Sequence, residues 1–290
     1  MISENMLLSN KILVQLGILL FLLLVVVPFV AAIVYALLYA SGSAGSLSTG
    51  FTLKYLTKVF TDGEVFISIG YSMYIATTTL LLAATVVFFL IICFRSSLLK
   101  GRFSYLVYLP LAFPSLVAGF ITLLILGKAG FFSRTLYHLH LINQLESFPG
   151  LVNDPFAIGI IITHALMAIP FLLIYFSSLY DSENIRELEM LATNLGSDTW
   201  QTTRFIILPM LLKKGFPTLL LYFIFVLGSY EVPLLLGVQS PQMISLLIIR
   251  KLQRFNLLDI PQGYCIALLY TFLLMVLLLL FFKSKKTIQS

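Results

Sequence analysis

One carboxylate lies within a long apolar stretch of this chain, where a charged group usually has a specific role. Glu231 stands 14 residues after Pro217, or about 21 Å along a continuous helix at 1.5 Å per residue. A charge in apolar surroundings is costly unless it lines a water-filled cavity or has a partner. Glu231 could therefore attract a cationic group, with Tyr230 beside it. It could equally form an ion pair with a basic residue that follows it: Arg250, Lys251 or Arg254.

Polar side chains in two other apolar stretches could contribute to binding. His164 could face a solute pathway, or it could pack in the interior and donate a hydrogen bond to a neighbouring carbonyl. Ser72 belongs to a patch of hydroxyl-bearing residues between Tyr71 and Thr79. Serine and threonine often form hydrogen bonds between membrane helices. We therefore expect part of this patch to hold helices together and part, with Ser72, to line a pathway.

The sequence lacks the motifs of several other kinds of chemistry. It contains no G-x-x-x-x-G-K-[ST] phosphate loop and no H-E-x-x-H or G-x-S-x-G signature. His138 and His140 stand two residues apart without an evident third ligand, which favours a solvated loop over a metal site. Cys93 and Cys265 both lie in apolar stretches, where small packing residues are favoured over a disulfide. We expect no catalytic residue and no cofactor, although an intramembrane enzyme remains an alternative.

The composition places these residues in a lipid bilayer. Sixty per cent of the 290 residues are hydrophobic and 10% are charged, whereas a soluble domain carries about 25% charged residues. A helix needs about 20 mostly apolar residues to span a bilayer. Six stretches are long enough, at roughly residues 12–40, 67–94, 105–127, 156–180, 217–238 and 263–282. The sequence predicts an all-α polytopic membrane protein, with residues 1–290 forming a single transmembrane domain.

The distribution of basic residues predicts the orientation. Six spans put both termini on one side, and with the termini in the cytoplasm the inner segments hold 11 lysines and arginines against seven outside. The short 95–102 loop and the C-terminal tail are purely basic, and both then lie inside, as the positive-inside rule expects. We attribute the net charge of +6 to topology and lipid contact rather than to nucleic-acid binding.

The polar segment 181–214 between the fourth and fifth spans does not read as a passive connector. Apolar residues recur at helical spacing over 185–195. Asp181 and Ser182 offer side chains that could cap the start of this helix, and Gly196 could end it. The sequence therefore predicts a short amphipathic helix on the cytoplasmic face.

A second short helix is expected directly after the first. Ser197 or Asp198 could cap it, it would run over about 199–208, and Pro209 follows it. Two amphipathic helices joined at a glycine would make a compact projection on the cytoplasmic side.

The projection also carries a spaced motif. It reads Met190-Leu191-Ala192, three residues, Gly196, nine residues, then Ile206-Ile207-Leu208-Pro209. This pattern resembles the cytoplasmic signature of the permease subunits of binding-protein-dependent ABC importers, Glu-Ala-Ala, three residues, Gly, nine residues, Ile-x-Leu-Pro. Met190 and Leu191 depart from that signature. Glu187 and Glu189 are close by but out of register.

The resemblance implies a fold, partners and a mechanism. The fold would be that of a type I ABC importer permease in a bacterial inner membrane, with cytoplasmic coupling helices. The segment from Glu187 to Pro209 would bind a cytoplasmic ATPase dimer, which hydrolyses ATP on a separate chain and drives the spans. A second permease, expected to be a related chain, and an extracytoplasmic solute-binding protein would complete the importer. A purely structural membrane subunit would leave this segment unexplained.

A shorter run suggests the solute. The run LGSYEVPLLLG at 227–237, followed by SPQMISLLIIRKLQ, resembles the polyamine-type branch of these permeases. Together with Glu231, this resemblance favours a small cationic solute, with polyamines first. A phosphonate, thiamine, an inorganic anion or an ion-coupled secondary transporter are the alternatives. In the outer loop, apolar residues between Pro241 and Arg254 repeat at helical spacing, and this helix could meet the binding protein or lie at the membrane interface.

Overall fold

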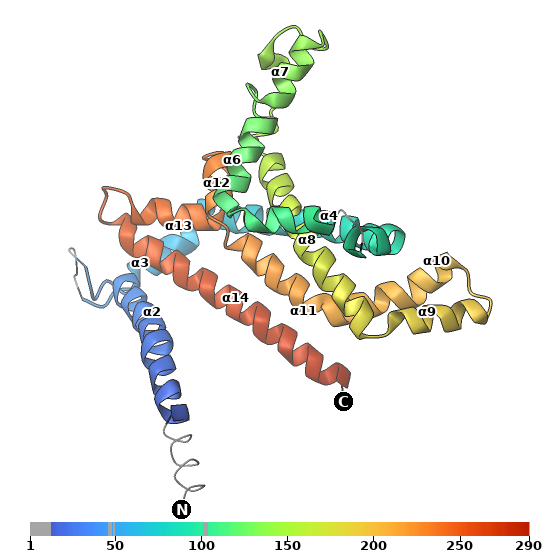
Figure 1. Cartoon of the computed structure of the whole chain (residues 1–290). Coiled ribbons are helices and arrows are strands. Elements are labelled where there is room, and N and C mark those ends of the chain that lie inside the picture. Colours follow the sequence, from blue (N-terminus) through green and yellow to red (C-terminus); the bar gives the residue numbers. More distant parts are fainter. Residues whose placement is uncertain (1–12, 46–47, 49, 101–103, 290) are drawn as a thin grey trace, which may run out of the picture. The chain divides into compact units, whose positions relative to one another are not determined.

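The computed structural model describes residues 13–45, 48, 50–100 and 104–289, and all regular secondary structure within these ranges is helical (Figure 1). The all-α prediction is confirmed. The elements are η1 Leu22–Val26, α2 Val27–Ala40, α3 Lys54–Thr61, α4 Gly63–Lys100, α5 Ser104–Tyr108, η2 Leu109–Ala112, α6 Ser115–Leu126, α7 Phe131–His138, η3 Leu145–Ser147, α8 Ile158–Ser182, α9 Ile185–Asn194, α10 Thr199–Thr202, η4 Thr203–Ile207, α11 Leu208–Leu227, α12 Glu231–Leu236, α13 Ile244–Leu252 and α14 Asp259–Gln289.

Six helical segments of the described chain are long and apolar enough to cross a membrane. They are Leu13–Ala40, Gly63–Phe94, Ser115–His138, Ile158–Ser182, Thr199–Leu227 and Asp259–Leu279. The number of spans agrees with the prediction, and four of the six lie close to their expected positions. The basic side chains of the 95–102 loop and of the C-terminal tail, which helped to set the orientation, lie outside the described side chains. The cytoplasmic placement of both termini stays a prediction.

The third and fifth spans differ from their predicted limits. The third begins at Ser115, because Pro114 takes an extended conformation with ψ of 150° and starts a new helix. The fifth begins at Thr199 and ends at Leu227 rather than covering 217–238. The predicted span left out Lys213 and Lys214, but both side chains are exposed on the surface of α11, where charges do not interrupt a helix.

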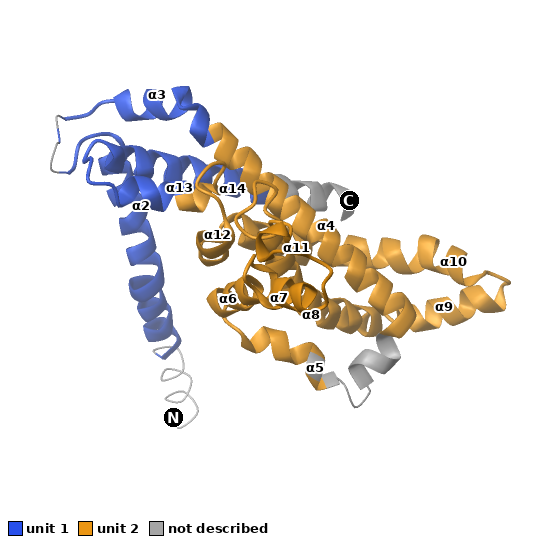
Figure 2. Cartoon of the chain, turned by 90° about the horizontal axis from the view of Figure 1, so that it is seen from above, with its two compact units in different colours: residues 1–65, 247–290 blue, residues 66–246 orange. Residues whose placement is uncertain are grey.

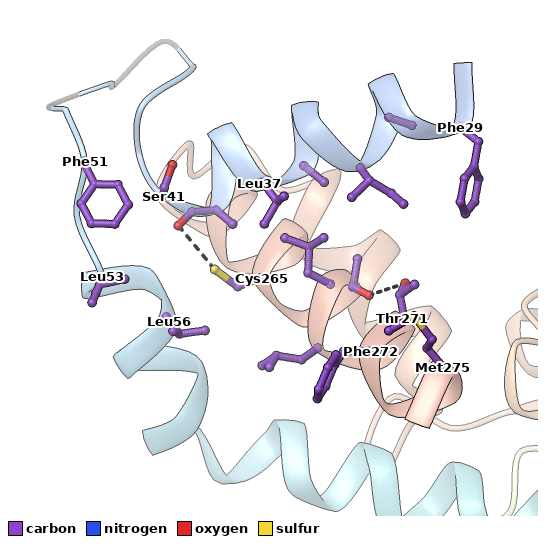
Figure 3. A pocket seen from close by; sticks show the side chains of 17 residues that line it. Phe29, Leu37, Ser41, Phe51, Leu53, Leu56, Cys265, Thr271, Phe272 and Met275 are labelled. Carbon is purple, nitrogen blue, oxygen red and sulfur yellow. Dashed lines mark hydrogen bonds between the residues drawn. The ribbon is translucent and has the colours of Figure 1, made fainter. Parts of the chain in front are cut away.

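The chain divides into two compact units (Figure 2). Unit 1 comprises residues 1–65 and 247–290. In it α14 packs against α2 and α3, and the rings of Tyr35, Tyr39 and Tyr264 cluster with centroids 4.8 to 5.9 Å apart. A pocket of about 640 Å³, lined almost wholly by apolar side chains, lies between α2, the chain leading into α3, and α14 (Figure 3).

Unit 2 comprises residues 66–246 and is built around α8. This helix packs against α6, α9, α11 and α12. The core of the unit joins the second half of α4 to α8, α9 and α11, through Ala83, Val87, Ile91, Ala168, Leu172, Leu173, Phe176, Tyr180, Ile185, Ile207, Leu211 and Leu219. Gly215 of α11 lies so close to Phe176 that a Cβ atom there would overlap the ring. The core of unit 2 therefore holds the base of the segment that carries the spaced motif.

Candidate functional site

The spaced motif lies on a helical hairpin of unit 2, formed by α9 and α10 (Figure 1). Gly196 connects the two helices with φ of 90°, a conformation that residues with a side chain rarely adopt. A Cβ atom at this position would meet nothing within 4 Å. Conformation rather than space therefore favours glycine here, as the sequence indicated.

The start of the second helix of the hairpin was predicted correctly. Asp198 Oδ1 accepts a hydrogen bond from the Gln201 N–H at 2.6 Å, and Gln201 Oε1 accepts one from the Asp198 N–H at 3.4 Å. This reciprocal arrangement is a capping box. It fixes the first turn of α10 and therefore the exit from the glycine turn.

The predicted caps of the first helix are wrong. Asp181 and Ser182 are the last residues of α8, and the Ser182 hydroxyl donates back to the Leu179 carbonyl at 3.1 Å. Asn184 precedes α9 instead, with φ of 51° and no side-chain cap. The hydrogen-bonded ladder of the fourth span continues through the two polar residues, and so the polarity of a residue alone did not mark the helix end.

Pro209 does not end the second helix, in contrast to the prediction. The chain runs from α10 through a π-helical turn, Thr203–Ile207, directly into α11, where Pro209 occupies the first turn. Proline lacks an N–H and its ring clashes with the carbonyl four residues earlier in an α-helix. The wider turn immediately before it moves that carbonyl away. Ile206, Leu208 and Pro209 therefore connect the hairpin to the fifth span without a break.

The hairpin has one buried side and one exposed apolar side. Ile185, Thr202, Thr203 and Ile207 are buried. The opposite side presents large apolar side chains that this chain does not cover, with Leu195 88% and Trp200 66% exposed. Of the motif residues, Met190 and Leu191 are exposed as well, as is Glu187, whereas Ala192 is half-buried. Several large exposed apolar side chains on one short hairpin are typical of an interaction surface.

Glu189 differs from its neighbours on α9. Its carboxylate accepts a hydrogen bond from the hydroxyl of Tyr180, which is buried at the end of α8. Sequence reasoning missed Tyr180 as a residue of this site. The available signal was a tyrosine in the last turn of an apolar helix, where its hydroxyl has to find a partner.

Glu231 is the first residue of α12, an exposed carboxylate that accepts a hydrogen bond from the Ser115 hydroxyl of α6. The chain leaves the helix at Leu227 and re-enters one at Glu231. The depth of about 21 Å derived for a continuous helix is therefore wrong. Tyr230 lies beside it and is half-buried. The sequence missed Ser115, although a serine directly after Pro114 in an apolar stretch was a signal.

Each basic residue offered as an ion-pair partner of Glu231 pairs with another carboxylate, within unit 1. Lys251 Nζ lies 3.2 Å from Asp62 Oδ2, and Arg254 contacts Asp259 at 3.3 Å. Arg250 pairs with Glu64. These pairs join α13 and the chain that follows it to residues 62–64 and to the start of α14. The sequence did not indicate this role.

Ser72 and His164 lie in the interior of unit 2. Ser72 is 1% exposed, donates to the Ser68 carbonyl at 2.8 Å and accepts from the Ile244 N–H at 2.8 Å. His164 is fully buried, and neither ring nitrogen has a hydrogen-bond partner among the described residues. The structure thus joins Glu231 to Ser115, whereas the hydrogen bonds of Ser72 go to other residues.

The sequence from residue 91 to residue 286 matches the family described as the binding-protein-dependent transport system inner membrane component. This match covers two thirds of the chain and includes the whole hairpin. The chain belongs to this family. The permease is accordingly a multi-pass protein of the inner membrane and a subunit for binding-protein-dependent transport.

Known proteins that resemble the permease include an ABC transporter permease. It is 30% identical over 132 residues to a probable molybdenum ABC transporter permease protein of Haloferax volcanii, an alignment that covers 46% of this chain and 44% of that relative. The permease thus aligns with less than half the length of this relative.

Solved structures agree on the fold. A bacterial ABC transporter involved in the import of the acidic polysaccharide alginate superposes with a TM-score of 0.69 at 18% identity, over 100% of this chain and 98% of the other. The bacterial alginate ABC transporter in complex with alginate pentasaccharide-bound periplasmic protein gives 0.67 at 18% identity, over 96% and 93% of the two chains. The type I importer fold is confirmed. None of these proteins is described as handling a polyamine, and the polyamine-type branch stays a prediction.

Proposed function

We propose that the permease forms part of the solute pathway of an ATP-driven importer, and that a separate cytoplasmic ATPase dimer drives it by binding the hairpin. The exposed apolar side of the hairpin carries this proposal. Leu195 and Trp200 are largely uncovered although the hairpin is anchored in the core of unit 2. A partner that covers them could displace the fifth span directly, because α10, η4 and α11 are continuous.

A second permease chain and an extracytoplasmic binding protein complete the proposed importer. In the most apolar stretch of the first span, 0% of the residues are buried within this chain. In the corresponding stretch of the third span, 17% are buried. Lipid and a second permease would together cover these surfaces. The alginate transporter bound to its periplasmic protein offers a precedent for the binding protein.

The solute that we propose is a small cation, with polyamines first. Glu231 is exposed, and α6 and α12, which present it, are otherwise apolar helices that pack together. A carboxylate that faced hydrocarbon would be costly, so this surface is better suited to a water-filled pathway. There a poorly screened negative charge raises the local concentration of cations.

An inorganic oxyanion is the second candidate. The Haloferax volcanii relative supports it, because that protein is described as a molybdenum transporter permease. For an oxyanion, the Glu231 carboxylate would repel the solute, and the attraction would have to come from other groups.

Two experiments test the proposal. The first purifies the tagged permease from its own cells and asks whether an ATPase subunit accompanies it. Leu195→Glu should reduce the amount of bound ATPase without lowering the abundance of the permease, since Leu195 is 88% exposed. Recovery of the permease without any ATPase would contradict the proposed function.

The second experiment compares the uptake of labelled spermidine and labelled molybdate by cells with and without the permease. Spermidine uptake that depends on the permease supports the cationic solute. Uptake of molybdate alone would replace it with the oxyanion.

A further inference from the structure

The joint between α8 and α9 consists of two residues. α8 ends at Ser182, and α9 begins at Ile185 after Asn184, whose φ of 51° lies in the left-handed region. A short connection of this kind can absorb a change of angle between the helices it joins. The angle between α8 and α9 therefore depends on contacts outside the connecting backbone.

A side-chain contact spans this joint. The hydroxyl of Tyr180, in the last turns of α8, donates to the carboxylate of Glu189, in the middle of α9. Tyr180 is 4% exposed and belongs to the core of unit 2. A hydrogen bond to an ionised acceptor is stronger than one between neutral groups, and the burial of Tyr180 restricts the access of water to it.

The packing around this contact is incomplete. A cavity of about 190 Å³ lies beside it, lined by Tyr180 and Glu189 and also by Cys93 of α4, Thr199 of α10 and Thr203 of η4. Ile185, one helical turn before Glu189 and on the same face of α9, is fully buried. Ile185 thus anchors the first turn of α9, and the Glu189 hydrogen bond anchors its middle beside an unfilled space.

We propose that the Tyr180–Glu189 contact is a strut that makes α8 follow α9 when the ATPase displaces the hairpin. This inference rests on the proposed function. Without the strut, rotation at Glu183 and Asn184 would absorb a displacement of α9. With it, α9 and α8 move as one body, and the fourth span follows the hairpin. Tyr180 and Glu189 are positioning residues in this account.

The register of the motif fits this role. The position that carries glutamate in the family signature is Met190, which is 51% exposed and faces away from the core. Glu189, one residue earlier, is half-buried and faces α8. The shift by one residue therefore turns a carboxylate from the partner's side of the hairpin to the permease's own fourth span.

Distance measurements between spin labels test the strut. The labels are placed by Leu166→Cys on α8 and Thr193→Cys on α9, two exposed positions, in a permease whose native cysteines are replaced by Cys93→Ser and Cys265→Ala. The tagged permease is purified with the ATPase that accompanies it and measured without nucleotide and after trapping with ATP and vanadate. Tyr180→Phe, which keeps the ring in the core, and Glu189→Ala, which removes the acceptor, are compared with Tyr175→Phe, a control that removes a tyrosine hydroxyl five residues earlier.

We expect the distance in the unaltered permease and in Tyr175→Phe to be narrow and insensitive to nucleotide, because α8 and α9 move together. In Tyr180→Phe and Glu189→Ala the nucleotide-free distribution of distances should be about twofold wider, since the middle of α9 is then no longer held to α8 and the short joint can bend. ATP with vanadate should shift the mean distance. The distance distribution of the double variant should be no wider than that of either single variant, because both substitutions remove the same contact.

The strut would be overturned if the distance distributions of the unaltered permease and of Tyr180→Phe were equally wide. It would also be overturned if nucleotide shifted the mean distance by the same amount in both. Loss of the ATPase from Tyr180→Phe or Glu189→Ala would also overturn it, because these residues would then serve docking rather than transmission. Absence of an ATPase from the unaltered permease would instead contradict the proposed function. The widths of the distance distributions measured without nucleotide would still show whether the Tyr180–Glu189 contact holds α9 to α8.

Discussion

Glu231 is accessible although it lies where two apolar helices meet, and the hydrogen bond it accepts comes from a neutral group, the Ser115 hydroxyl. A carboxylate paired with a cation inside the protein would be neutralised and would contribute little to the field in a pathway. The three nearby basic residues in the sequence pair elsewhere. None of these three residues neutralises Glu231, and the residue can be tested by removing its charge alone.

Glu231→Gln keeps the shape of the side chain and its hydrogen bond from Ser115. If the solute is a cation, the rate of spermidine uptake should fall about tenfold, which corresponds to about 1.4 kcal/mol of lost attraction. The amount of assembled importer should change little. Glu146→Gln, which removes another exposed carboxylate of unit 2, is the control and should transport normally. Equal spermidine uptake by Glu231→Gln and the unaltered permease would remove the argument for a cationic solute.

Gly215 tests the packing of α11 against α8. Gly215→Ala should lower the free energy of unfolding of the purified permease by about 1–3 kcal/mol, because its Cβ atom would overlap the Phe176 ring in the core. Gly70→Ala is the matched control, since a Cβ atom at Gly70 of α4 meets nothing within 4 Å. Alanine there should stabilise the helix by about 0.5–1 kcal/mol. Similar shifts of the unfolding temperature for both variants would show that the close approach is absent.

At the scale of elements, the hairpin combines a capped helix start with a turn that depends on glycine. The capping box at Asp198 fixes α10, whereas Gly196 holds the chain at φ of 90° with free space around it. Substitutions at Gly196 therefore test the backbone conformation of the turn.

Gly196→Val should weaken ATPase binding and transport while leaving membrane insertion intact. A β-branched residue at this φ costs about 1–2 kcal/mol, and the turn would move to relieve that cost. Gly196→Asn, which tolerates the left-handed region far better, should retain most of the ATPase that co-purifies. Normal transport by Gly196→Val at normal abundance would show that the turn does not depend on this conformation.

Met190→Glu restores the residue of the family signature at an exposed position. It should be tolerated, with unchanged abundance and unchanged co-purification of the ATPase, because the family signature carries a glutamate at this position. A loss of the ATPase would show that the partner surface here is apolar and closely packed around Met190.

The elements also show what could be read from the sequence. Six spans, the glycine turn and the Asp198 cap followed from hydropathy and from local chemistry, because each depends on residues close together in the chain. The end of α8, the passage of the helix through Pro209 and the break before Glu231 did not. In each case distant packing or a change of helical turn overrode a local signal. The Tyr180–Glu189 contact and the ion pairs of α13 also depend on how helices meet.

At the scale of the whole molecule, the orientation of the permease in the membrane follows from its basic residues alone and is open to a direct test. A single cysteine introduced as Ser197→Cys, in a chain with Cys93→Ser and Cys265→Ala, should react with an impermeant thiol reagent only from the cytoplasmic side. Phe255→Cys, at a fully exposed position between α13 and α14, is the control and should react only from outside. Labelling of Ser197→Cys in intact cells would contradict both the topology and the role of the hairpin.

The π-helical turn at Thr203–Ile207 has a consequence for how this region can change during evolution. A π turn is equivalent to one residue inserted into an α-helix, and each residue of an α-helix advances the chain by about 100°. Deleting one residue between Gly196 and Pro209 would therefore restore a plain α-helix and swing Trp200 and the glycine turn about 100° around the axis of α11. Substitutions in this stretch can be accepted one at a time, whereas insertions and deletions would redirect the whole hairpin. The nine-residue interval should accordingly resist changes of length more strongly than changes of sequence.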